Sequence, residues 1–430
     1  MLAIDSYPSY TKTSKPSSES TETTETETMS YQVPKDVVSK WSVEYVGSTP
    51  IEELIQKKID ESPEDAFYFV DLGRVVAKYK QWMENLPRAK PYYAIKCNPS
   101  TAVIKTLASF GVNFDCASQS EIQQILGCGV APNRIIYANP CKMKSHIRYA
   151  KSMGVEMMTF DNKDELLKCA EVYPNAKLVL RIITDDSQSV CKFSTKFGAP
   201  LDVCEELIAT AKDLGLNIVG ISFHVGSGCM SVASFESAIT NSARIFKMAE
   251  NYGYKFNFLD LGGGWPGNDN ESAIAFNDIA AAIRPLLDRL FPEDVKIIAE
   301  PGRYFVAESH TLAVNVFAKR AMDTGYGDRK FLYYVNDGVY QSFNCIFFDH
   351  NSPKALVFAP GDRTDLYRST IFGPTCDSMD CIAKDILLPE LEVGEWLYFK
   401  DMGAYTVAAA SPFNGFQSCP TTYYIESDVL

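Results

Sequence analysis

Four short segments of the chain each lead from apolar residues into a side chain that can do chemistry. They are residues 91–96 (PYYAIK), 223–228 (FHVGSG), 259–264 (LDLGGG) and 299–303 (AEPGR). Each apolar run is too short for a helix and is expected to form a buried strand. The runs end in a lysine, a histidine, a glycine triplet, and a glutamate followed by an arginine. Function at the ends of buried strands is typical of barrel enzymes.

Lys96, Glu300 and His224 have the chemistry needed to hold an aromatic cofactor that carries an aldehyde. A partly desolvated lysine has a lowered amine pKa and can form a Schiff base. A carboxylate beside a pyridine nitrogen keeps that nitrogen protonated, which makes the ring an electron sink. Glu300 suits this role, and His224 suits stacking on the ring face. Taken singly, Lys96 is a snorkelling lysine and His224 a core histidine; their shared position at strand ends favours the functional interpretation.

Glycines at two neighbouring strand ends predict a phosphate site. Residues 262–264 are all glycine, and glycines after the seventh strand of a barrel let backbone N–H groups approach a phosphate. One strand later, Gly302 and Arg303 add a second glycine and a cation, and Ser227 adds a hydroxyl. A glycine triplet alone is often only a turn, so the signal depends on the set.

Eight apolar runs, each closed by a polar residue or glycine, must position these side chains. With helical patterns between them, they predict a (β/α)8 barrel, and a doubly wound open sheet is the competing fold. Ser118 and Glu121 form a capping box, Asn162 precedes a second helix, and residues 201–214 are amphipathic. The runs are residues 92–95, 112–114, 135–138, 157–160, 177–180, 218–223, 258–261 and 295–299.

The pattern changes twice along the chain and predicts three parts. Residues 1–34 contain a Thr/Glu repeat and are expected to be a disordered tail. Residues 72–308 form the barrel, and residues 35–71 with 309–430 form a mainly β-sheet domain. The strand-like segments of that domain are 66–70, 311–317, 331–335, 355–358 and 396–399, with a turn at 336–338.

Composition excludes several classes of protein. The net charge of −13 argues against nucleic acid as a partner. The 12 cysteines include no CxxC pair, which indicates a reduced intracellular protein. The four histidines lie far apart and predict no metal site. No apolar run is long enough to span a membrane, and the N-terminus has no signal-peptide pattern. A cytoplasmic protein is expected.

Eight motifs, taken together, carry a family resemblance. The chain closely resembles the pyridoxal-phosphate-dependent basic amino acid decarboxylases with an alanine-racemase-like barrel, and within them the eukaryotic ornithine decarboxylases. The resemblance covers roughly residues 35 to 425 and implies pyridoxal 5′-phosphate as the cofactor. The motifs are residues 94–98 (AIKCN), 114–118 (FDCAS), 222–228 (SFHVGSG), 261–264 (LGGG), 300–304 (EPGRY), 334–338 (YVNDG), 373–377 (GPTCD) and 401–405 (DMGAY).

The resemblance implies a role for each matching residue. Lys96 matches the lysine that binds the cofactor covalently, and His224 the histidine that stacks on its ring. Glu300 matches the partner of the ring nitrogen, while Asp115 and Arg181 match supporting residues. The implied phosphate site consists of Ser227, Gly264, Gly302, Arg303 and Tyr405.

Further matching residues imply how the substrate is bound and protonated. Cys376 matches the cysteine that returns a proton to the substrate α-carbon, although alone it would be a small buried hydrophobe. Asp349 and Asp377 match the pair that holds a distal amine, which predicts a diamino acid because two carboxylates need a cation between them. Phe348 stands where the family often has tyrosine. The resemblance favours ornithine; lysine, arginine and diaminopimelate are the alternatives, since one methylene is worth only about 1–3 kcal/mol.

The resemblance also implies protein partners. Active sites in this family are shared across a homodimer, with the loop that carries Cys376 and Asp377 reaching the partner's site. Antizyme-inhibitor proteins share the family's appearance but have lost cofactor-site residues, so an inactive protein is the rival interpretation. A basic stretch resembles the antizyme-binding region of animal members, with an ordinary solvated helix face as the alternative. That stretch consists of Lys142, Lys144, Arg148 and Lys151.

Overall fold

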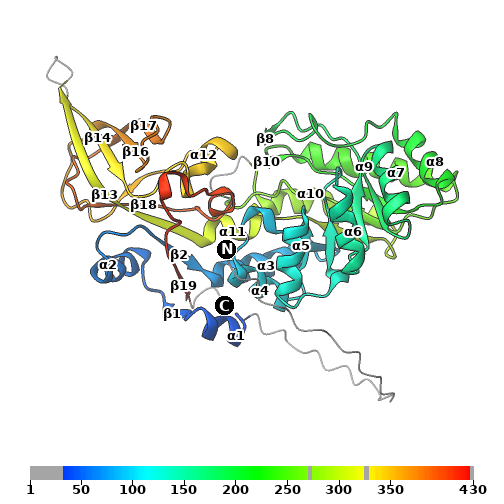
Figure 1. Ribbon diagram of the computed structural model, residues 1–430, viewed down its shortest axis with the longest axis horizontal. Helices are drawn as coiled ribbons and strands as arrows, with labels where there is room; N and C mark the ends of the chain where they lie inside the picture. The colour runs from blue at the N-terminus through cyan, green and yellow to red at the C-terminus, as the bar shows by residue number, and fades with distance from the viewer. Residues whose placement is uncertain (1–31, 270–273, 324–328, 427–430) are drawn as a thin grey trace. The chain divides into compact units, whose positions relative to one another are not determined.

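The computed structural model describes residues 32–269, 274–323 and 329–426 (Figure 1). The tail predicted over residues 1–34 lies outside these ranges except for its last three residues. Two short helices, α1 (Lys35–Lys40) and α2 (Ile51–Glu61), precede the first central strand. Over the described ranges, every helix is too short or too polar to cross a membrane.

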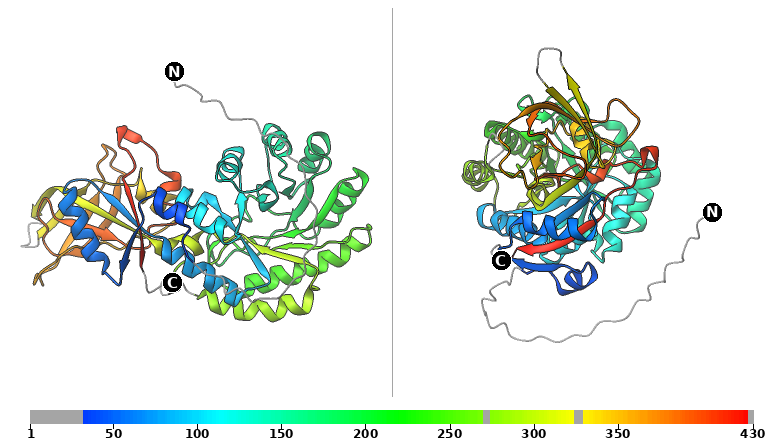
Figure 2. Two further views of the ribbon diagram at one scale, coloured as in Figure 1. Left: turned by 90° about the horizontal axis from the view of Figure 1, so that it is seen from below. Right: turned by 90° about the vertical axis from the view of Figure 1, so that its left-hand side faces the viewer.

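Eight parallel strands close into a barrel, as predicted, so the alternative of an open doubly wound sheet is wrong. Around the barrel the order is β11-β12-β3-β4-β5-β6-β7-β9. Figure 2 shows helices on the outside of these strands. The strands are β3 (Ala89–Ala94), β4 (Asn113–Cys116), β5 (Ile135–Tyr137), β6 (Met157–Phe160), β7 (Lys177–Arg181), β9 (Asn217–Ser222), β11 (Phe258–Asp260) and β12 (Lys296–Ala299). The helices are α3 (Leu72–Asn85), α4 (Thr101–Ser109), α5 (Gln119–Gly127), α6 (Lys144–Ser152), α7 (Lys163–Val172), α8 (Cys204–Asp213), α9 (Val232–Glu250), α10 (Phe276–Leu290) and the short α11 (Arg303–Val306).

The helix starts follow from their capping residues. The Ser118 side chain accepts a hydrogen bond from the Glu121 N–H at the start of α5, and Glu121 accepts one from the Ala117 N–H. Ser118 thus caps the helix as predicted, whereas Glu121 reaches the N–H one residue before the cap, so the predicted capping box forms only in part. The Asn162 side chain caps α7 by accepting from the Glu165 N–H at 2.9 Å. Both caps fix where the chain turns from a strand end into a helix.

Two polar residues lie inside strands rather than after them. Asp115 belongs to β4, where it pairs with Ala94 and Ile136 on the neighbouring strands. Arg181 is the last residue of β7. The sequence pattern ended each strand at its last apolar residue. The backbone pairing of β4 and β7 continues one or two residues beyond that point. Both side chains therefore sit on the barrel itself.

A second, nine-stranded sheet contains the strands predicted on both sides of the barrel segment. Its strand β2 precedes the barrel in sequence and pairs with β13 and β19. Four of its strands, β1, β16, β17 and β19, were not predicted. The domain limits of 35–71 with 309–430 stay a prediction. The strands are β1 (Glu44–Gly47), β2 (Phe67–Asp71), β13 (His310–Asp323), β14 (Arg329–Val335), β15 (Leu356–Val357), β16 (Tyr367–Phe372), β17 (Cys381–Leu388), β18 (Trp396–Phe399) and β19 (Thr421–Glu426).

The turn predicted at residues 336–338 begins slightly later and does not close a hairpin. The N–H groups of Gln341 and Phe343 both donate to the Gly338 carbonyl, each at 3.0 Å. The next strand, β15, pairs with β18, and β16 after it pairs with β14 in parallel. A short helix, α12 (Cys345–Phe348), lies in this connection.

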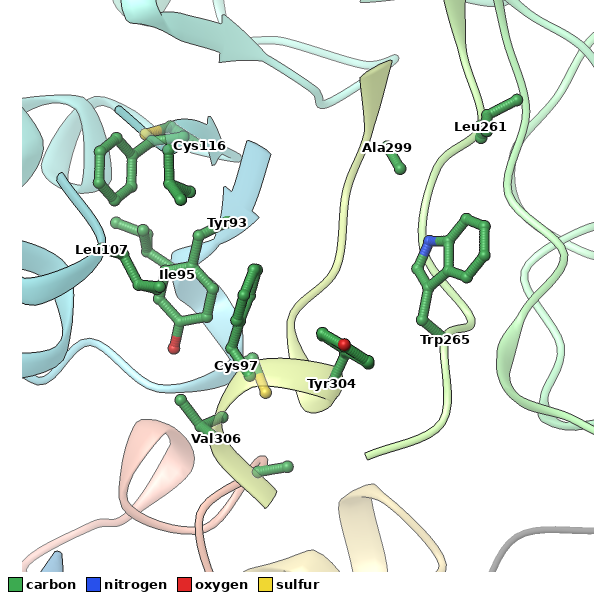
Figure 3. Packing of buried hydrophobic residues seen from close by; sticks show 14 of the residues in the cluster. Tyr93, Ile95, Cys97, Leu107, Cys116, Leu261, Trp265, Ala299, Tyr304 and Val306 are labelled. Carbon is green, nitrogen blue, oxygen red and sulfur yellow. The ribbon is translucent and has the colours of Figure 1, made fainter. Parts of the chain in front are cut away.

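Buried side chains join the end of β3 to the segments that follow β12. Figure 3 shows this packing around α11, with Cys97 beside Tyr304 and Val306 of the helix and Trp265 across from it. Beneath them, His310 at the start of β13 contacts Asn98, which also donates to the Gly403 carbonyl at 2.9 Å. The backbone after Lys96 is thereby fixed to the chain around residue 403, which brings Tyr405 to the barrel.

Candidate active site

Lys96 and Asp115 meet at the ends of neighbouring barrel strands. Lys96 lies in a single 3-10 turn (Ile95–Cys97) directly after β3, and its Nζ donates a hydrogen bond to Asp115 Oδ2. Asp115 is fully buried, and its Oδ1 has no hydrogen-bond partner. The lysine is half-buried, so its amine can be reached from the cavity described below.

Charges around Lys96 determine its protonation. Burial acts to lower the pKa of Lys96, but the carboxylates of Asp115 and Glu300 outweigh it, and the pKa is raised. The lowered pKa expected from the sequence is therefore wrong, and the group is an ammonium at neutral pH. Burial raises the pKa of Asp115 against the opposing effect of the Lys96 cation. Because Asp115 accepts the Lys96 hydrogen bond, it is the base placed to take the proton that the amine must lose before it acts as a nucleophile.

Glu300 presents an unsatisfied oxygen at the end of β12. Its side chain is buried, its N–H donates to the Gly262 carbonyl at 2.8 Å, and its Oε1 has no hydrogen-bond partner. Burial, and then the nearby charges of Asp260 and Asp115, raise the pKa of Glu300 well above its usual range. A buried carboxyl oxygen without a partner is costly. A protonated ring nitrogen would satisfy this oxygen, so the site fits the pyridine end of the expected cofactor.

Arg181 supplies the second cation of this carboxyl cluster. Its guanidinium lies 5.3 Å from the ring centroid of Phe197. Burial lowers the pKa of Arg181, and the carboxylates of Glu300 and Asp161 only partly offset this. The cluster around Lys96 thus contains more carboxyl groups than cations, which leaves room for a positive charge on a bound molecule.

His224 lies two residues after the end of β9, and its ring is fixed from two sides. Its Nδ1 accepts a hydrogen bond from the Gly226 N–H at 3.0 Å, which leaves the proton of a neutral ring on Nε2. The ring of Phe193 packs edge-on against it, with 4.8 Å between centroids. Burial, and then the cations Arg181 and Lys96, lower the pKa of His224 well below its usual value. A neutral imidazole at this place can lie against a cationic ring without repelling it.

We expect the rings of His224 and His310 to stay neutral when the pH is lowered from 8 to about 5, although an ordinary histidine titrates near 6.5. The reason is that burial lowers the pKa of both side chains. Burial lowers the pKa of His310 to about 4. Since the unfolded chain binds these protons and the native chain does not, both groups reduce the free energy of unfolding as the pH falls below about 6.5. The measurement is NMR of the histidine ring signals over this range, assigned with His224→Gln and His310→Gln. A signal of either residue that titrates near pH 6.5 would contradict the expectation.

The predicted phosphate site is assembled from three strand ends. Arg303, the first residue of α11, donates to the Ser227 hydroxyl at 3.1 Å, and its guanidinium lies 5.2 Å from the ring centroid of Tyr405. Gly264 has φ +106°, and a Cβ there would stand 2.6 Å from the Gly226 carbonyl oxygen. Only glycine therefore lets the backbone pass this point, next to the hydroxyl and guanidinium donors.

These groups line one cavity with about 320 Å³ of empty space, part of it open to solvent. Eight of the ten residues predicted to bind the cofactor face it, and the other two, Asp115 and Arg181, stand behind Lys96 and Glu300. Gly263 of the predicted glycine triplet completes the wall, together with Ala94 and Trp265, which were not predicted. The eight are Lys96, His224, Ser227, Gly264, Glu300, Gly302, Arg303 and Tyr405.

Asp349 lies in an adjoining cavity that shares Ser227 and Arg303 with the first. It is buried and accepts a hydrogen bond from Arg303 at 2.5 Å, while its Oδ2 has no hydrogen-bond partner. Burial raises the pKa of Asp349, although the Arg303 cation opposes this. Its predicted role toward a distal amine stays a prediction, with Oδ2 as the oxygen that remains for it.

The remaining predicted residues stand apart from the cofactor cavity. Phe348 is 69% exposed at the end of α12, and Cys376 is exposed in the connection between β16 and β17. Asp377 accepts a hydrogen bond from the Tyr340 hydroxyl. The N–H of Met379, and then Tyr340, lower the pKa of Asp377. Within the described part of a single chain, none of these three side chains lines the cavity that contains Lys96.

Two further site residues were missed from the sequence. Asp260 ends β11, where its Oδ2 accepts from the Ser222 hydroxyl at 2.8 Å and its Oδ1 from the Gly262 N–H at 2.9 Å. An aspartate inside an otherwise apolar run was an available signal for it. Tyr340, the partner of Asp377, had no local signal because their contact joins segments 37 positions apart.

Comparisons with known proteins agree with one another and cover most of the chain. The family described as "Pyridoxal-dependent decarboxylase, pyridoxal binding domain" matches residues 72–307. Antizyme inhibitor 2 of Xenopus laevis is 51% identical over 383 residues, and ornithine decarboxylase of Rattus norvegicus is 50% identical over 391; both matches cover 87% of this chain and 84% of the relative. The crystal structure of the Paramecium bursaria Chlorella virus arginine decarboxylase superposes with a TM-score of 0.81 at 35% identity, covering 87% of this chain and all of that one.

Proposed function

The chain belongs to the pyridoxal-dependent decarboxylase family that includes the ornithine decarboxylases, and from this premise we propose that it converts L-ornithine to putrescine and CO2, the first step of polyamine biosynthesis. The observation that carries this proposal is the cavity where Lys96, the unpartnered Glu300 oxygen and the Ser227–Arg303 pair converge. An inactive relative would not need to keep all three in place.

The residues of this cavity would hold pyridoxal 5′-phosphate, whose ring delocalises the electron pair left on the α-carbon when CO2 departs. Lys96 would hold the aldehyde carbon after Asp115 has taken its proton. The Glu300 carboxyl, whose pKa is raised by burial and by the charges of Asp260 and Asp115, would bind the protonated ring nitrogen and serve as its counter-charge. Ser227 and Arg303 would bind the phosphate.

The substrate must be oriented and reprotonated by groups that lie outside this cavity in one chain. We infer a homodimer in which the segment with Cys376 and Asp377 enters the partner's site, since both side chains are solvent-accessible here. The Cys376 Sγ–H would then give the proton that replaces CO2 on the α-carbon. Asp377 would bind the distal ammonium of the substrate, as its lowered pKa keeps it a carboxylate.

Ornithine is expected to be decarboxylated in preference to lysine, arginine and diaminopimelate. Release of CO2 from each amino acid by the purified, cofactor-loaded chain tests this directly. One methylene separates lysine from ornithine, so lysine should be slower in kcat/KM by roughly 10- to 200-fold. Asp377→Asn should raise KM for ornithine, because the distal ammonium loses its counter-charge. Equal rates with diaminopimelate would contradict the proposed substrate class.

A second candidate function is binding of antizyme without catalysis, which the similarity to antizyme inhibitor 2 favours. Its signature would be a chain that neither gains visible absorbance with pyridoxal phosphate nor releases CO2. The chain keeps Lys96, Asp115, His224 and Glu300 at the cofactor site, and this supports the enzyme instead. A cytoplasmic location stays a prediction.

Antizyme binding is also proposed for the active enzyme, through the basic stretch at α6. Lys142 does not belong to this surface as predicted: it is 2% exposed, precedes the helix, and pairs with the buried Glu165. Lys144 and Arg148 are exposed. We expect the double charge reversal Lys144→Glu with Arg148→Glu to weaken antizyme binding by roughly tenfold or more, measured by calorimetry. Unchanged binding would rule out this surface.

A further inference from the structure

A separate, open cavity lies at one edge of the second sheet, with about 1050 Å³ of empty space that includes part of the adjoining solvent. It opens where β2 and β19 end, β13 begins and β18 ends, close to the first turn of α2. We call it the acidic cavity, because five carboxylates line it against two cations, Arg74 and Lys400. The carboxylates are those of Glu52, Asp71, Glu308, Asp401 and Glu426.

Neighbouring groups compensate only part of this negative charge. Glu308 is paired with Lys78, which lies outside the cavity wall, at 3.0 Å. Arg74 is 3.5 Å from Glu426 and its side chain is 48% exposed. It therefore offsets part of the charge of Glu426 without occupying the cavity. Glu52 accepts a hydrogen bond from the Tyr398 hydroxyl at 2.8 Å, and the Lys400 cation acts on it from a greater distance. The cavity therefore retains a negative potential that favours a cation.

Asp71 is the group that points to a ligand. It is 2% exposed, and its Oδ1 already accepts hydrogen bonds from the N–H groups of Gly73 and Glu426, at 2.8 and 3.4 Å. Its Oδ2 has no hydrogen-bond partner, and its only ion pair is a long one, 3.9 Å from Arg74 Nε. Burial raises the pKa of Asp71 to about 6, so at neutral pH it is an under-compensated carboxylate. A positively charged donor in the cavity would satisfy it.

The arrangement favours an extended cation over a metal ion. Among the described residues, no group of three or more His, Cys, Asp or Glu side chains converges closely enough to bind a metal. The carboxylates are instead spread over four strand ends and a helix start, and Pro50, Ile51 and Tyr424 provide apolar surface between them. Two or more ammonium groups joined by methylenes match both features.

We infer that the acidic cavity binds an alkyl diammonium or polyammonium ion, with one ammonium on Asp71 Oδ2 and another toward Glu52 or Glu426. Such ions could be the diamine product of the active site or a longer polyamine. The choice of these amines rests on the proposed function, whereas the charge and geometry of the cavity do not. The cavity shares Asn268 and Asp401 with the cavity that contains Asp349, so the two sites have a common wall.

The test is calorimetric titration of the cofactor-loaded full chain with putrescine, spermidine and, as a monocation control, butylamine. Asp71→Asn keeps an oxygen for the Gly73 N–H but removes the charge, and should weaken binding to the acidic cavity about tenfold or more. Lys400→Gln removes a cation from the wall and should strengthen amine binding several-fold. Glu53→Gln, on the same helix as Glu52 but outside the cavity, should change neither. The relative affinities of putrescine and spermidine show whether the cavity prefers the diamine product or a longer polyamine.

Asp377→Asn separates this site from the active site. The Asp377→Asn chain should still bind one diamine, and Asp71→Asn should decarboxylate with kcat within about twofold of wild type. If the chain is no decarboxylase, the effects of Asp71→Asn and Lys400→Gln on amine binding remain, so the two proposals fail separately. The inference is overturned if Lys400→Gln leaves amine affinity unchanged, if butylamine binds as tightly as putrescine, or if Asp377→Asn abolishes all amine binding.

Discussion

Lys96→Ala should lower decarboxylation by at least about 10³-fold and abolish the visible absorbance gained with pyridoxal phosphate. The reason is local: Lys96 is the amine in the cofactor cavity, and it sits against the one carboxylate, Asp115, that can take its proton. Alanine leaves no nucleophile there and also leaves Asp115 buried without its cation. Spectrophotometric titration with pyridoxal phosphate and a CO2-release assay measure the two effects independently.

Lys90→Ala is the matched control for this variant. Lys90 lies on the same strand, β3, but is exposed and does not line the cavity. It should retain activity and absorbance close to wild type, because surface substitutions change the free energy of unfolding by only about 0.5 kcal/mol. A Lys96→Ala chain that keeps its activity would overturn the proposed chemistry, whatever else the cavity binds.

The sequence predicted the parts of the site that depend on strand ends. An apolar run that stops at Lys96, His224 or Glu300 is a local pattern, and the closed barrel then brings such ends together because parallel strands share one edge. The protonation of Lys96 was predicted wrongly because it does not depend on a local pattern. It depends on Asp115, which lies inside the adjacent strand and is buried by the packing of the whole barrel.

The second sheet was harder to predict because its outer strands are amphipathic and irregular. β17 contains Lys384 and Asp385 in its middle, and Asp385 has φ +55°, so neither an apolar run nor a clean alternation identifies it. Likewise, helical spacing placed Lys142 on a basic surface, but the residue precedes α6, and the buried Glu165 draws it inward. Residues distant in sequence determine both the strand β17 and the position of Lys142. No local pattern in a single sequence identifies such partners.

Mixing two inactive variants should restore activity if the active sites are shared. Lys96→Ala and Cys376→Ala chains should each lose activity, the second by roughly 10²-fold or more. A mixed dimer combines an intact barrel from one chain with an intact Cys376 segment from the other, so one of its two sites works. Random exchange of equal amounts makes half of the dimers mixed, and about a quarter of wild-type activity should return. The measurement is CO2 release after co-refolding or co-expression.

A mixture of Lys96→Ala with Glu300→Gln chains is the matched control, because both changes affect the same barrel cavity and every mixed dimer then has two defective sites. Recovery in the first mixture without recovery in the second can arise only if Cys376 acts on the partner's cavity. The geometry favours this outcome for an active enzyme, since Cys376 is exposed and does not line the cavity of its own chain. Full activity of a chain that sediments as a monomer under assay conditions would instead mean that the segment between β16 and β17 moves to its own barrel.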